Sequence, residues 1–481
     1  MAHPLHDTLI VSVSGLRGVV GGSLSADVAV RYAAAFLATL PPGPIVIGRD
    51  GRPSGPLFAA ALSDFFTRQG RDVIDCGVAA TPTLGIVVRA ERAAGGIQIS
   101  ASHNPARYNG LKLFSAAGRV LPAAAGAVVL AIFHAHVSAS EASSAASPDL
   151  NAAQEERASG GLPRGAVRAG DGTAAHVRLV AAIVDAAAIR RHRPRVWLDS
   201  GHGAGSCVAR ALLEHLGCEA VIEGGTPDGL YEHEPEPTAE NLAALLPRIP
   251  AAGADIGFFQ DPDADRLAIA TADGRFIGEE ATLALAVEGA LTKSAGPIVV
   301  NCSTSGMAAM IAARHGVPCH VSAVGEANVV DRMLATGALL GGEGNGGVID
   351  PRVVLVRDSF VAMALVLERM CLGEQLQTID SLARGLPQLF MKKTKIDLSP
   401  EIRGDALAIA MDRIAVAFPA AIVSRLDGLR LDWPGGWLLV RSSNTEPIVR
   451  IVAEATDAAA VEEALARATA ALLKIPFPTI V

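Results

Sequence analysis

Short runs of Val and Ile alternate with longer Ala- and Leu-rich segments along most of the chain. The segments 44–50, 193–201 and 296–304 each hold a strand-like apolar run, which is followed by a helical pattern and a second strand-like run. Glycine closes each helical pattern, as is common at helix C-termini. Because parallel strands need a crossover between them, these units predict three similar α/β domains with mixed, mostly parallel sheets.

The pattern changes near residue 390. A helical segment, several strand-like runs and a final helix predict a smaller α+β domain at the C-terminal end. Residues 138–173 are rich in Ala, Ser, Gly and charge, which predicts a linker or a surface insertion. These breaks predict four domains, at 1–150, 174–278, 279–390 and 391–481.

The composition narrows the class of protein. The chain has 481 residues, of which 50% are apolar and 19% charged, so it can bury several cores. A net charge of −8 argues against nucleic acid or an anionic membrane as the main partner. Six scattered cysteines, the absence of a signal-like start and the short apolar runs predict a cytoplasmic protein with free thiols.

The segment QDPDADR carries three carboxylates at alternate positions, Asp261, Asp263 and Asp265. On an extended loop this spacing places them on one side, where they repel unless a cation such as Mg²⁺ neutralises them. A calcium EF-hand does not fit, because Arg266 and Ala272 stand where that loop needs Gly and Glu. The remaining alternative is an acidic turn before a hairpin.

The segment ISASHNPARYNGLK presents Ser102 beside the turn signals Asn-Pro and Asn-Gly. A serine used covalently needs an exposed hydroxyl and nearby groups that stabilise charge, and His103 and Lys112 are candidates for this role. The alternative is an ordinary serine in a turn.

Two further loops carry ligand-binding chemistry. RSSNTEP offers Arg441, Ser443, Asn444 and Thr445, with Arg450 nearby, which is a suitable donor set for a phosphate. The alternative is a polar hairpin loop.

The second of these loops is GGEGNGG, where Glu343 and Asn345 offer an acceptor and an amide suited to sugar hydroxyls. Its formal match to a dinucleotide-binding motif is weak because no helical pattern follows. A better dinucleotide candidate is LDSGHGAGS, which lies between a strand and a helix, with Glu223 ending the next strand. Its weakness is Ser206, which replaces the last glycine. A nicotinamide-dependent oxidoreductase is therefore a rival hypothesis.

These motifs, in this order, resemble those of the α-D-phosphohexomutase superfamily, which contains phosphoglucomutases, phosphomannomutases and phosphoglucosamine mutases. SGLRGVVG, with Arg17, is similar to the N-terminal loop of that family, and GRDGRPSG and ATPTLG are similar to two further loops of the first domain. The resemblance covers nearly the whole chain.

The resemblance implies four domains around a central cleft and a Mg-dependent phosphohexomutase. Ser102 would carry a phosphoryl group and complete the coordination of Mg²⁺ by the three aspartates. A hexose 1,6-bisphosphate would be the intermediate and activator. Arg17, His103, Lys112 and Arg266 would offset anionic oxygens, while the other two loops would bind the sugar and its second phosphate.

Two departures from the family pattern concern the proton-transfer residues. Gly347 stands where many relatives have His, and Ala323 stands where many have Lys. The expected substrate is a small sugar phosphate, with glucosamine phosphate favoured over glucose or mannose phosphate. A catalytically inactive sugar-phosphate binder is the non-enzyme alternative. A monomer or a homodimer is expected.

Overall fold

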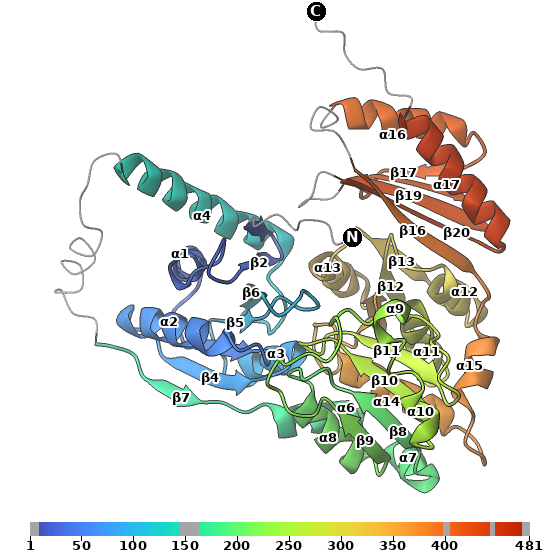
Figure 1. Ribbon diagram of the computed structural model, residues 1–481, viewed down its shortest axis with the longest axis horizontal. Coiled ribbons are helices and arrows are strands. Elements are labelled where there is room, and N and C mark those ends of the chain that lie inside the picture. Colours follow the sequence, from blue (N-terminus) through green and yellow to red (C-terminus); the bar gives the residue numbers. More distant parts are fainter. Residues whose placement is uncertain (1–8, 145–162, 398–404, 443–447, 474–481) are drawn as a thin grey trace, which may run out of the picture.

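The computed structural model describes residues 9–144, 163–397, 405–442 and 448–473, whose strands form four sheets. In Figure 1 the N-terminal unit (blue) lies on the left, the second (green) below, and the third (yellow to orange) to the right. The C-terminal unit (red) stands at the upper right. Three sheets are mixed and the fourth is antiparallel, which confirms the predicted α/β class with a smaller C-terminal α+β unit.

The first sheet has seven strands in the order β1-β2-β6-β5-β3-β4-β7, and β3 is parallel to β4 and β5. Its strands are β1 (Ile10–Ser12), β2 (Gly15–Val19), β3 (Ile45–Arg49), β4 (Val73–Val78), β5 (Gly95–Ile99), β6 (Tyr108–Ser115) and β7 (Val167–Ala169). Its helices are α1 (Ala26–Leu37), α2 (Gly55–Arg68), α3 (Thr81–Ala90) and α4 (Ala123–Ser144).

Alternation along β3 assigns its side chains to two different cores. Ile45 and Ile47 pack in the cluster that contains α1 and α2, whereas Val46 packs with Leu84 of α3 in the other. Successive side chains of a strand point to opposite faces, so a run of Val and Ile can serve helices on both sides of a sheet.

The second and third sheets have four strands each, in the orders β11-β10-β8-β9 and β13-β12-β14-β15. The second unit comprises α6 (Thr173–Ala182), α7 (Ala186–His192), β8 (Arg195–Asp199), α8 (Ser206–His215), β9 (Glu219–Glu223), α9 (Ala239–Leu242), α10 (Arg248–Ala251), β10 (Ile256–Gln260) and β11 (Leu267–Thr271). The third comprises α11 (Glu279–Leu291), β12 (Ile298–Asn301), α12 (Met307–Arg314), β13 (Cys319–Ser322), α13 (Glu326–Thr336), β14 (Leu340–Glu343), β15 (Gly347–Ile349), α14 (Ser359–Met370) and α15 (Ile379–Gly385).

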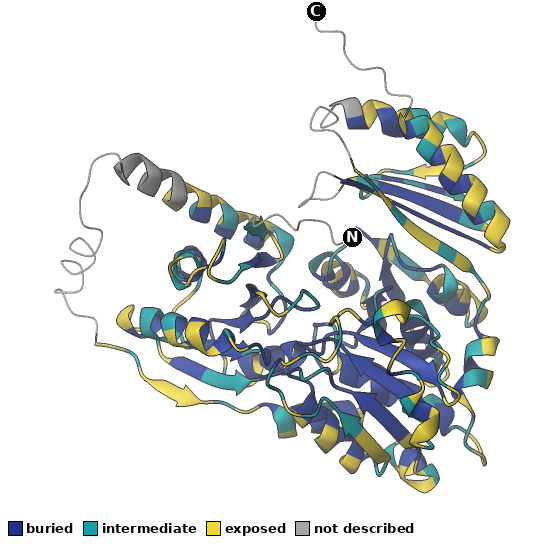
Figure 2. Cartoon of the chain, in the orientation of Figure 1, coloured by how far each residue is buried: buried dark blue, intermediate teal, exposed yellow. Residues whose placement is uncertain are grey.

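The first three units share one continuous apolar core. Leu84, Leu198 and Phe360, from three different units, belong to the same buried cluster. Every residue of α14 except Arg369 is buried, as expected for a helix that is apolar on all sides. Figure 2 shows this buried interior around α14, β10 and β11. The shared core holds the loops of the first three units in fixed relation.

The C-terminal unit has a core of its own. Its antiparallel sheet has the order β16-β20-β19-β18-β17, and helices α16 and α17 pack against it. Its elements are β16 (Phe390–Asp397), α16 (Asp405–Ala417), β17 (Ile422–Ser424), β18 (Leu429–Trp433), β19 (Gly436–Ser442), β20 (Ile448–Ala455) and α17 (Ala458–Leu473). A separate small apolar cluster that includes Cys302 and Trp437 joins this unit to the third one.

Part of the stretch 138–173 has regular structure, which corrects the prediction of a linker there. The helix α4 continues to Ser144, and β7 pairs in parallel with β4 at the edge of the first sheet. Among the residues that the structure describes, no helix combines the length and the apolar character needed to cross a membrane.

Candidate active site

The candidate site forms where loops follow the carboxyl ends of parallel strands. Ser102 comes shortly after β5, the acidic loop follows β10, and Glu343 ends β14. Ligands of open α/β sheets bind outside these strand ends. The shared core therefore brings together functional side chains that are spread over more than two hundred residues of sequence.

A buried ion pair fixes the loop that carries Ser102. Arg52 pairs with Asp50 (Nε–Oδ2 2.9 Å) and donates to four carbonyl oxygens of the loop, those of Ser102, Asn104, Pro105 and Tyr108. Asp50 also accepts from the Ser100 hydroxyl, which in turn accepts from the Ser102 amide (2.9 Å). Ser102 has φ of +51°, a conformation that a non-glycine residue holds only where its surroundings impose it.

The three carboxylates of the acidic loop form a cluster beside this serine. Asp261, Asp263 and Asp265 are fully buried, and each offers a ligand oxygen within 4.8 Å of the others. The Ser102 hydroxyl donates to Asp261 Oδ2 at 3.0 Å. Asp263 Oδ1 and Asp265 Oδ1 are buried without a hydrogen-bond partner, and an unpaired buried carboxylate oxygen is costly. The donor set and its unpaired oxygens fit a Mg²⁺ ion.

The pKa values of Asp261 and Asp265 are shifted in opposite directions. Burial, followed by the charges of Asp265 and Asp263, raises the pKa of Asp261 to about 8. Burial would also raise the pKa of Asp265, but Arg357 and Lys112 outweigh it and hold that pKa below its usual range. Each positive charge near the cluster therefore stabilises the ionised form of its carboxylates.

Lys112, on β6, is the nearest of these cations. Its Nζ lies 2.5 Å from Asp263 Oδ2 and 2.8 Å from Asp265 Oδ2. Burial alone would lower the pKa of Lys112, but the two carboxylates raise it, so this amine keeps its charge. Thr81 adds a hydroxyl bond to Asp263 from the first helix turn of α3.

Arg266, His103 and Arg17 surround the serine on its other side. Arg266 Nε lies 3.2 Å from Asp261 Oδ2, and its Nη2 donates to His103 Nδ1. Burial, together with Arg266 and Arg17, holds the pKa of His103 well below its usual value, so its ring is neutral with Nδ1 as an acceptor. Arg17 donates to Asn104 Oδ1 at 3.1 Å.

The glycine-rich loop contributes Glu343, whose two oxygens are both engaged. Oε1 accepts from Asn301 Nδ2 (2.7 Å) and the Gly325 amide (3.0 Å), and Oε2 pairs with Arg357 Nη1 (2.8 Å). Asn345 is half-buried, and its Oδ1 accepts from the amide of Gly347 at 3.3 Å.

Comparison with known families covers all four units. The matching families are described as phosphoglucomutase/phosphomannomutase alpha/beta/alpha domains I, II and III and the C-terminal domain, over residues 9–139, 174–274, 279–390 and 400–471. The chain belongs to the phosphoglucomutase/phosphomannomutase family. Members of this family are phosphohexomutases, which are isomerases that transfer a phosphoryl group within a sugar phosphate.

Relatives match over nearly their full length. A phosphoglucomutase/phosphomannomutase of Thermococcus kodakarensis is 33% identical over 92% of this chain and 93% of its own. A probable phosphoglucosamine mutase of Methanopyrus kandleri is 30% identical with the same coverage. The crystal structure of a phosphoglucomutase/phosphomannomutase family protein from Burkholderia thailandensis has a TM-score of 0.79 at 27% identity and covers 98% of this chain and 100% of that one.

In this mutase family member, the C-terminal loop predicted to bind phosphate is described only in part. Ser443, Asn444 and Thr445 lie outside the described residues. Arg441 and Arg450 face each other across β19 and β20, and Arg441 Nη2 lies 3.3 Å from Asp427 Oδ2. The structure therefore gathers the predicted residues of the first three units and leaves these two arginines on a separate sheet.

Sequence reasoning missed three contributors to the site. Arg357 pairs with both Asp265 and Glu343, and the Asp50–Arg52 pair frames the serine loop. The motif GRDGRPSG, which contains that pair, was interpretable only as a strand-to-helix turn. Arg357 stands next to Asp358 in an otherwise apolar stretch, and no spacing rule links it to the acidic loop ninety residues earlier.

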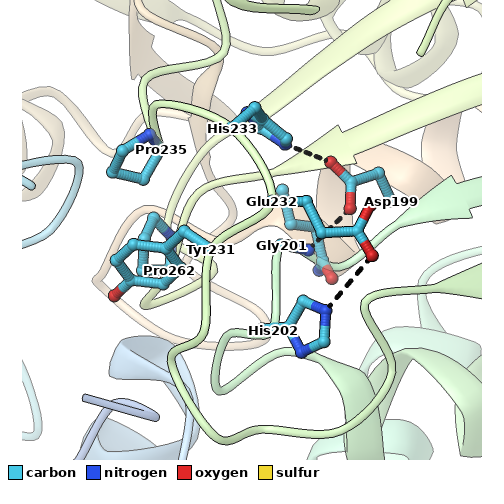
Figure 3. Close-up of a pocket in the computed structure, with 9 residues that line it drawn as sticks. Asp199, Gly201, His202, Tyr231, Glu232, His233, Pro235 and Pro262 are labelled. Atoms are coloured by element: carbon cyan, nitrogen blue, oxygen red, sulfur yellow. Dashed lines mark hydrogen bonds and ion pairs between the residues drawn. The ribbon is translucent and has the colours of Figure 1, made fainter. Parts of the chain in front are cut away.

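The rival dinucleotide motif has a packing role in the structure. A Cβ at Gly203 would lie 2.6 Å from the Pro262 carbonyl oxygen, and one at Gly205 would lie 2.5 Å from Gln260 Oε1. The glycines therefore let this loop approach the acidic loop closely. Figure 3 shows the pocket between them, where His233 Nε2 meets Asp199 Oδ2 at 2.8 Å. Glu223, the acidic residue of the rival motif, accepts a hydrogen bond from Trp197 Nε1 and forms an ion pair with Arg248.

Proposed function

We propose that this phosphohexomutase is a phosphoglucosamine mutase, which interconverts glucosamine 6-phosphate and glucosamine 1-phosphate through a phosphoserine at Ser102. The observation that carries the proposal is the 3.0 Å contact between the Ser102 hydroxyl and Asp261, within a buried triad of carboxylates. A phosphoryl group on that hydroxyl would stand next to the only such acidic triad among the described residues.

The proposed reaction consists of two reciprocal transfers. The free hydroxyl of the sugar monophosphate forms a bond to phosphorus as the P–Oγ bond of phosphoserine breaks, which gives a hexose 1,6-bisphosphate. The proton of that hydroxyl passes, in net terms, to Ser102 Oγ. The bisphosphate then presents its other phosphate, and the reverse transfer regenerates phosphoserine and releases the isomeric monophosphate. Added bisphosphate would for the same reason phosphorylate and activate the free serine.

The residues around Ser102 suit this chemistry, which depends on positioning and charge neutralisation. Asp261, Asp263 and Asp265 would hold Mg²⁺, which when bound supplies Lewis-acid stabilisation of the transferring phosphoryl group. Arg266 is buried beside the serine and Lys112 is buried beside Asp263 and Asp265, so both can help to neutralise phosphoryl oxygens. Neutral His103 offers a ring nitrogen 3.4 Å from Ser102 Oγ.

The substrate is proposed from the names of relatives together with the motifs. Several archaeal relatives, among them those of Methanopyrus kandleri and Pyrococcus horikoshii, are named probable phosphoglucosamine mutases at 30% identity. The Thermococcus kodakarensis relative, which is 33% identical, is named a phosphoglucomutase/phosphomannomutase. Activity on glucose or mannose phosphates is therefore the second candidate. Glu343 and Asn345 would hold sugar hydroxyls, and Arg441 and Arg450 the phosphate that is not reacting.

Intact-mass spectrometry tests the covalent step. After incubation with Mg²⁺ and glucose 1,6-bisphosphate, the protein is expected to gain about 80 Da, the mass of one phosphoryl group. Ser102→Ala should lose both this adduct and mutase activity, whereas Ser115→Ala, a serine at the far end of β6, should retain both. An adduct that persists in Ser102→Ala would contradict the proposal. Sugar-phosphate binding without adduct or turnover would favour the inactive binder.

Coupled assays with the three sugar phosphates test the substrate. With Mg²⁺ and a trace of the matching bisphosphate, kcat/KM is expected to be highest for glucosamine phosphate. A preference for glucose or mannose phosphate would contradict the proposed substrate but not the proposed mutase mechanism. A cytoplasmic location and a monomeric or homodimeric state stay predictions from the sequence.

A further inference from the structure

Arg357 contacts carboxylates of two different units of the site. It lies between β15 and α14, and its side chain is only 12% exposed. Its Nη2 lies 2.7 Å from Asp265 Oδ2 in the second unit, and its Nη1 lies 2.8 Å from Glu343 Oε2 in the third. One planar guanidinium therefore joins the acidic loop to the glycine-rich loop.

A third carboxylate orients this arginine. Glu326, at the start of α13, accepts the Arg357 backbone amide at 2.8 Å and lies 3.4 Å from its Nε. Because Glu326 holds both the backbone and the side chain, the guanidinium is supported independently of the two loops that it joins.

Gly347 makes room for this side chain. A Cβ at position 347 would overlap Arg357 Cδ and lie 2.9 Å from its Cγ. Arg357, from a later segment of the chain, thus occupies the space that a side chain at position 347 would fill. A residue larger than glycine at 347 would therefore require the Arg357 side chain or the loop to shift.

The contacts of Arg357 determine how the neighbouring carboxylates are presented. Asp265 Oδ2 is shared between Arg357 and Lys112, so Oδ1, which has no hydrogen-bond partner and lies 3.8 Å from Arg266 Nε, is the oxygen available to a bound cation. At the other end, Arg357 holds one oxygen of Glu343, while Asn301 and Gly325 hold the second. The same side chain thus sets the orientation of a metal-site carboxylate and of a sugar-loop carboxylate.

We propose that Arg357 is a positioning residue that couples the metal site to the sugar site. A Mg²⁺ ion bound to the acidic triad fixes Asp265 and, with it, one end of the Arg357 guanidinium. Less conformational entropy is then lost when Glu343, at the other end, is ordered. Mg²⁺ and sugar phosphate then raise each other's affinity, and this coupling is reciprocal by thermodynamic necessity. The inference rests on the proposed function of the two loops.

Calorimetric titrations on a Ser102→Ala background, which prevents turnover, test the coupling. Mg²⁺ affinity is measured with and without glucosamine 6-phosphate, and the ratio of the two dissociation constants gives the coupling factor. Arg357→Gln is expected to weaken Mg²⁺ binding by about 10-fold or more, as is typical for groups that orient metal ligands. Its coupling factor should fall towards 1, because the connection between the loops is lost.

Arg352→Gln is the matched control. Arg352 lies in the same segment and pairs with buried Asp350, but it contacts neither loop of the site. It should retain both the Mg²⁺ affinity and the coupling factor. Arg357→Lys keeps the charge but cannot hold two carboxylates in a fork, so it should restore much of the Mg²⁺ affinity and little of the coupling.

The outcomes separate this inference from the proposed function. The role of Arg357 would be overturned if both Arg357→Gln and Arg357→Lys kept the coupling factor of the Arg352→Gln control. This holds even if their Mg²⁺ affinity fell. If Arg357→Gln does not fold, Arg357→Lys alone decides by the same criterion. Absence of Mg²⁺ and sugar-phosphate binding in the protein with both Ser102 and Arg357 intact would instead overturn the proposed function.

Discussion

At the scale of single residues, the serine loop shows how much structure is needed to place one hydroxyl, which the fold buries although the sequence predicted it to be exposed. Ser102 holds a left-handed backbone conformation, and the loop around it contributes four carbonyl oxygens to one buried guanidinium. Both members of the Asp50–Arg52 pair are fully buried. Such a pair adds little net stability but is costly to break, so its value here is geometric.

We expect Arg52→Lys to disorder the serine loop. An ammonium has three donors and no planar fork, so it cannot serve Asp50 and four carbonyls together. The first unfolding transition in urea should lose about 3 kcal/mol of stability, and phosphorylation of Ser102 should slow, as followed by intact mass. Arg68→Lys, in an exposed pair with Asp64, should change neither. Equal behaviour of the two variants would refute this view of Arg52.

At the scale of elements, a buried histidine connects three helices. His176 of α6 has one ring nitrogen 2.9 Å from the Thr83 hydroxyl of α3 and the other 2.7 Å from Asp358. Asp358 is also the N-cap of α14, where it accepts from the amides of Phe360 and Val361. All three polar side chains are buried, and together they fix how the first three units meet.

Removal of this histidine should weaken the junction of the first three units. In His176→Ala, the buried Asp358 carboxylate and the Thr83 hydroxyl each lose a partner, which predicts a loss of about 2–4 kcal/mol. Urea denaturation and limited proteolysis measure the effect. His136→Ala, on the exposed face of α4, provides the baseline. Unchanged stability in His176→Ala would mean that apolar packing alone holds the units together.

At the scale of the whole molecule, polar contacts tie the C-terminal unit to the third unit. Glu454 accepts from the Gly306 amide (2.7 Å) and Asp427 from the Val324 amide (3.0 Å). Glu280, at the start of α11, accepts from the Ser305 amide at 2.9 Å and pairs with Lys393 of β16 at 3.2 Å. Burial, only partly offset by Lys393, raises the pKa of Glu280 from 4.5 to about 7.

This shift predicts how stability depends on pH. The folded chain binds the Glu280 proton more tightly than the unfolded chain, so the associated stability is complete below pH 4.5 and is lost as pH rises through about 7. Glu280→Gln should remove this dependence, which amounts to about 3 kcal/mol between the two limits. Urea denaturation across that range measures it.

The control for this prediction is an ion pair that involves the same strand, β16. Glu462 pairs with Lys392, the neighbour of Lys393, but both side chains of that pair are exposed. Glu462→Gln should therefore follow the pH dependence of the unmodified protein. If Glu280→Gln also follows it, the carboxylate titrates normally and the junction is not sensitive to pH.

The sequence predicted the fold class well because that class depends on local patterns. Strand–helix–strand units and the spacing of Asp261, Asp263 and Asp265 are visible within short windows. Arg357 was not predictable, because its partners Asp265 and Glu343 reach it only through tertiary packing. For the same reason, the sequence predicted Glu343 as an acceptor for sugar hydroxyls but not the protein contacts that engage both of its oxygens.

Strand β7 bears on how the N-terminal unit can be studied in isolation. Val167–Ala169 pairs with the outer edge of β4, although it follows that strand by almost ninety residues. A truncation before residue 163 would leave β4 with unpaired backbone groups, and exposed strand edges invite self-association. A well-behaved excised fragment therefore has to run past residue 169, into the segment that leads to α6.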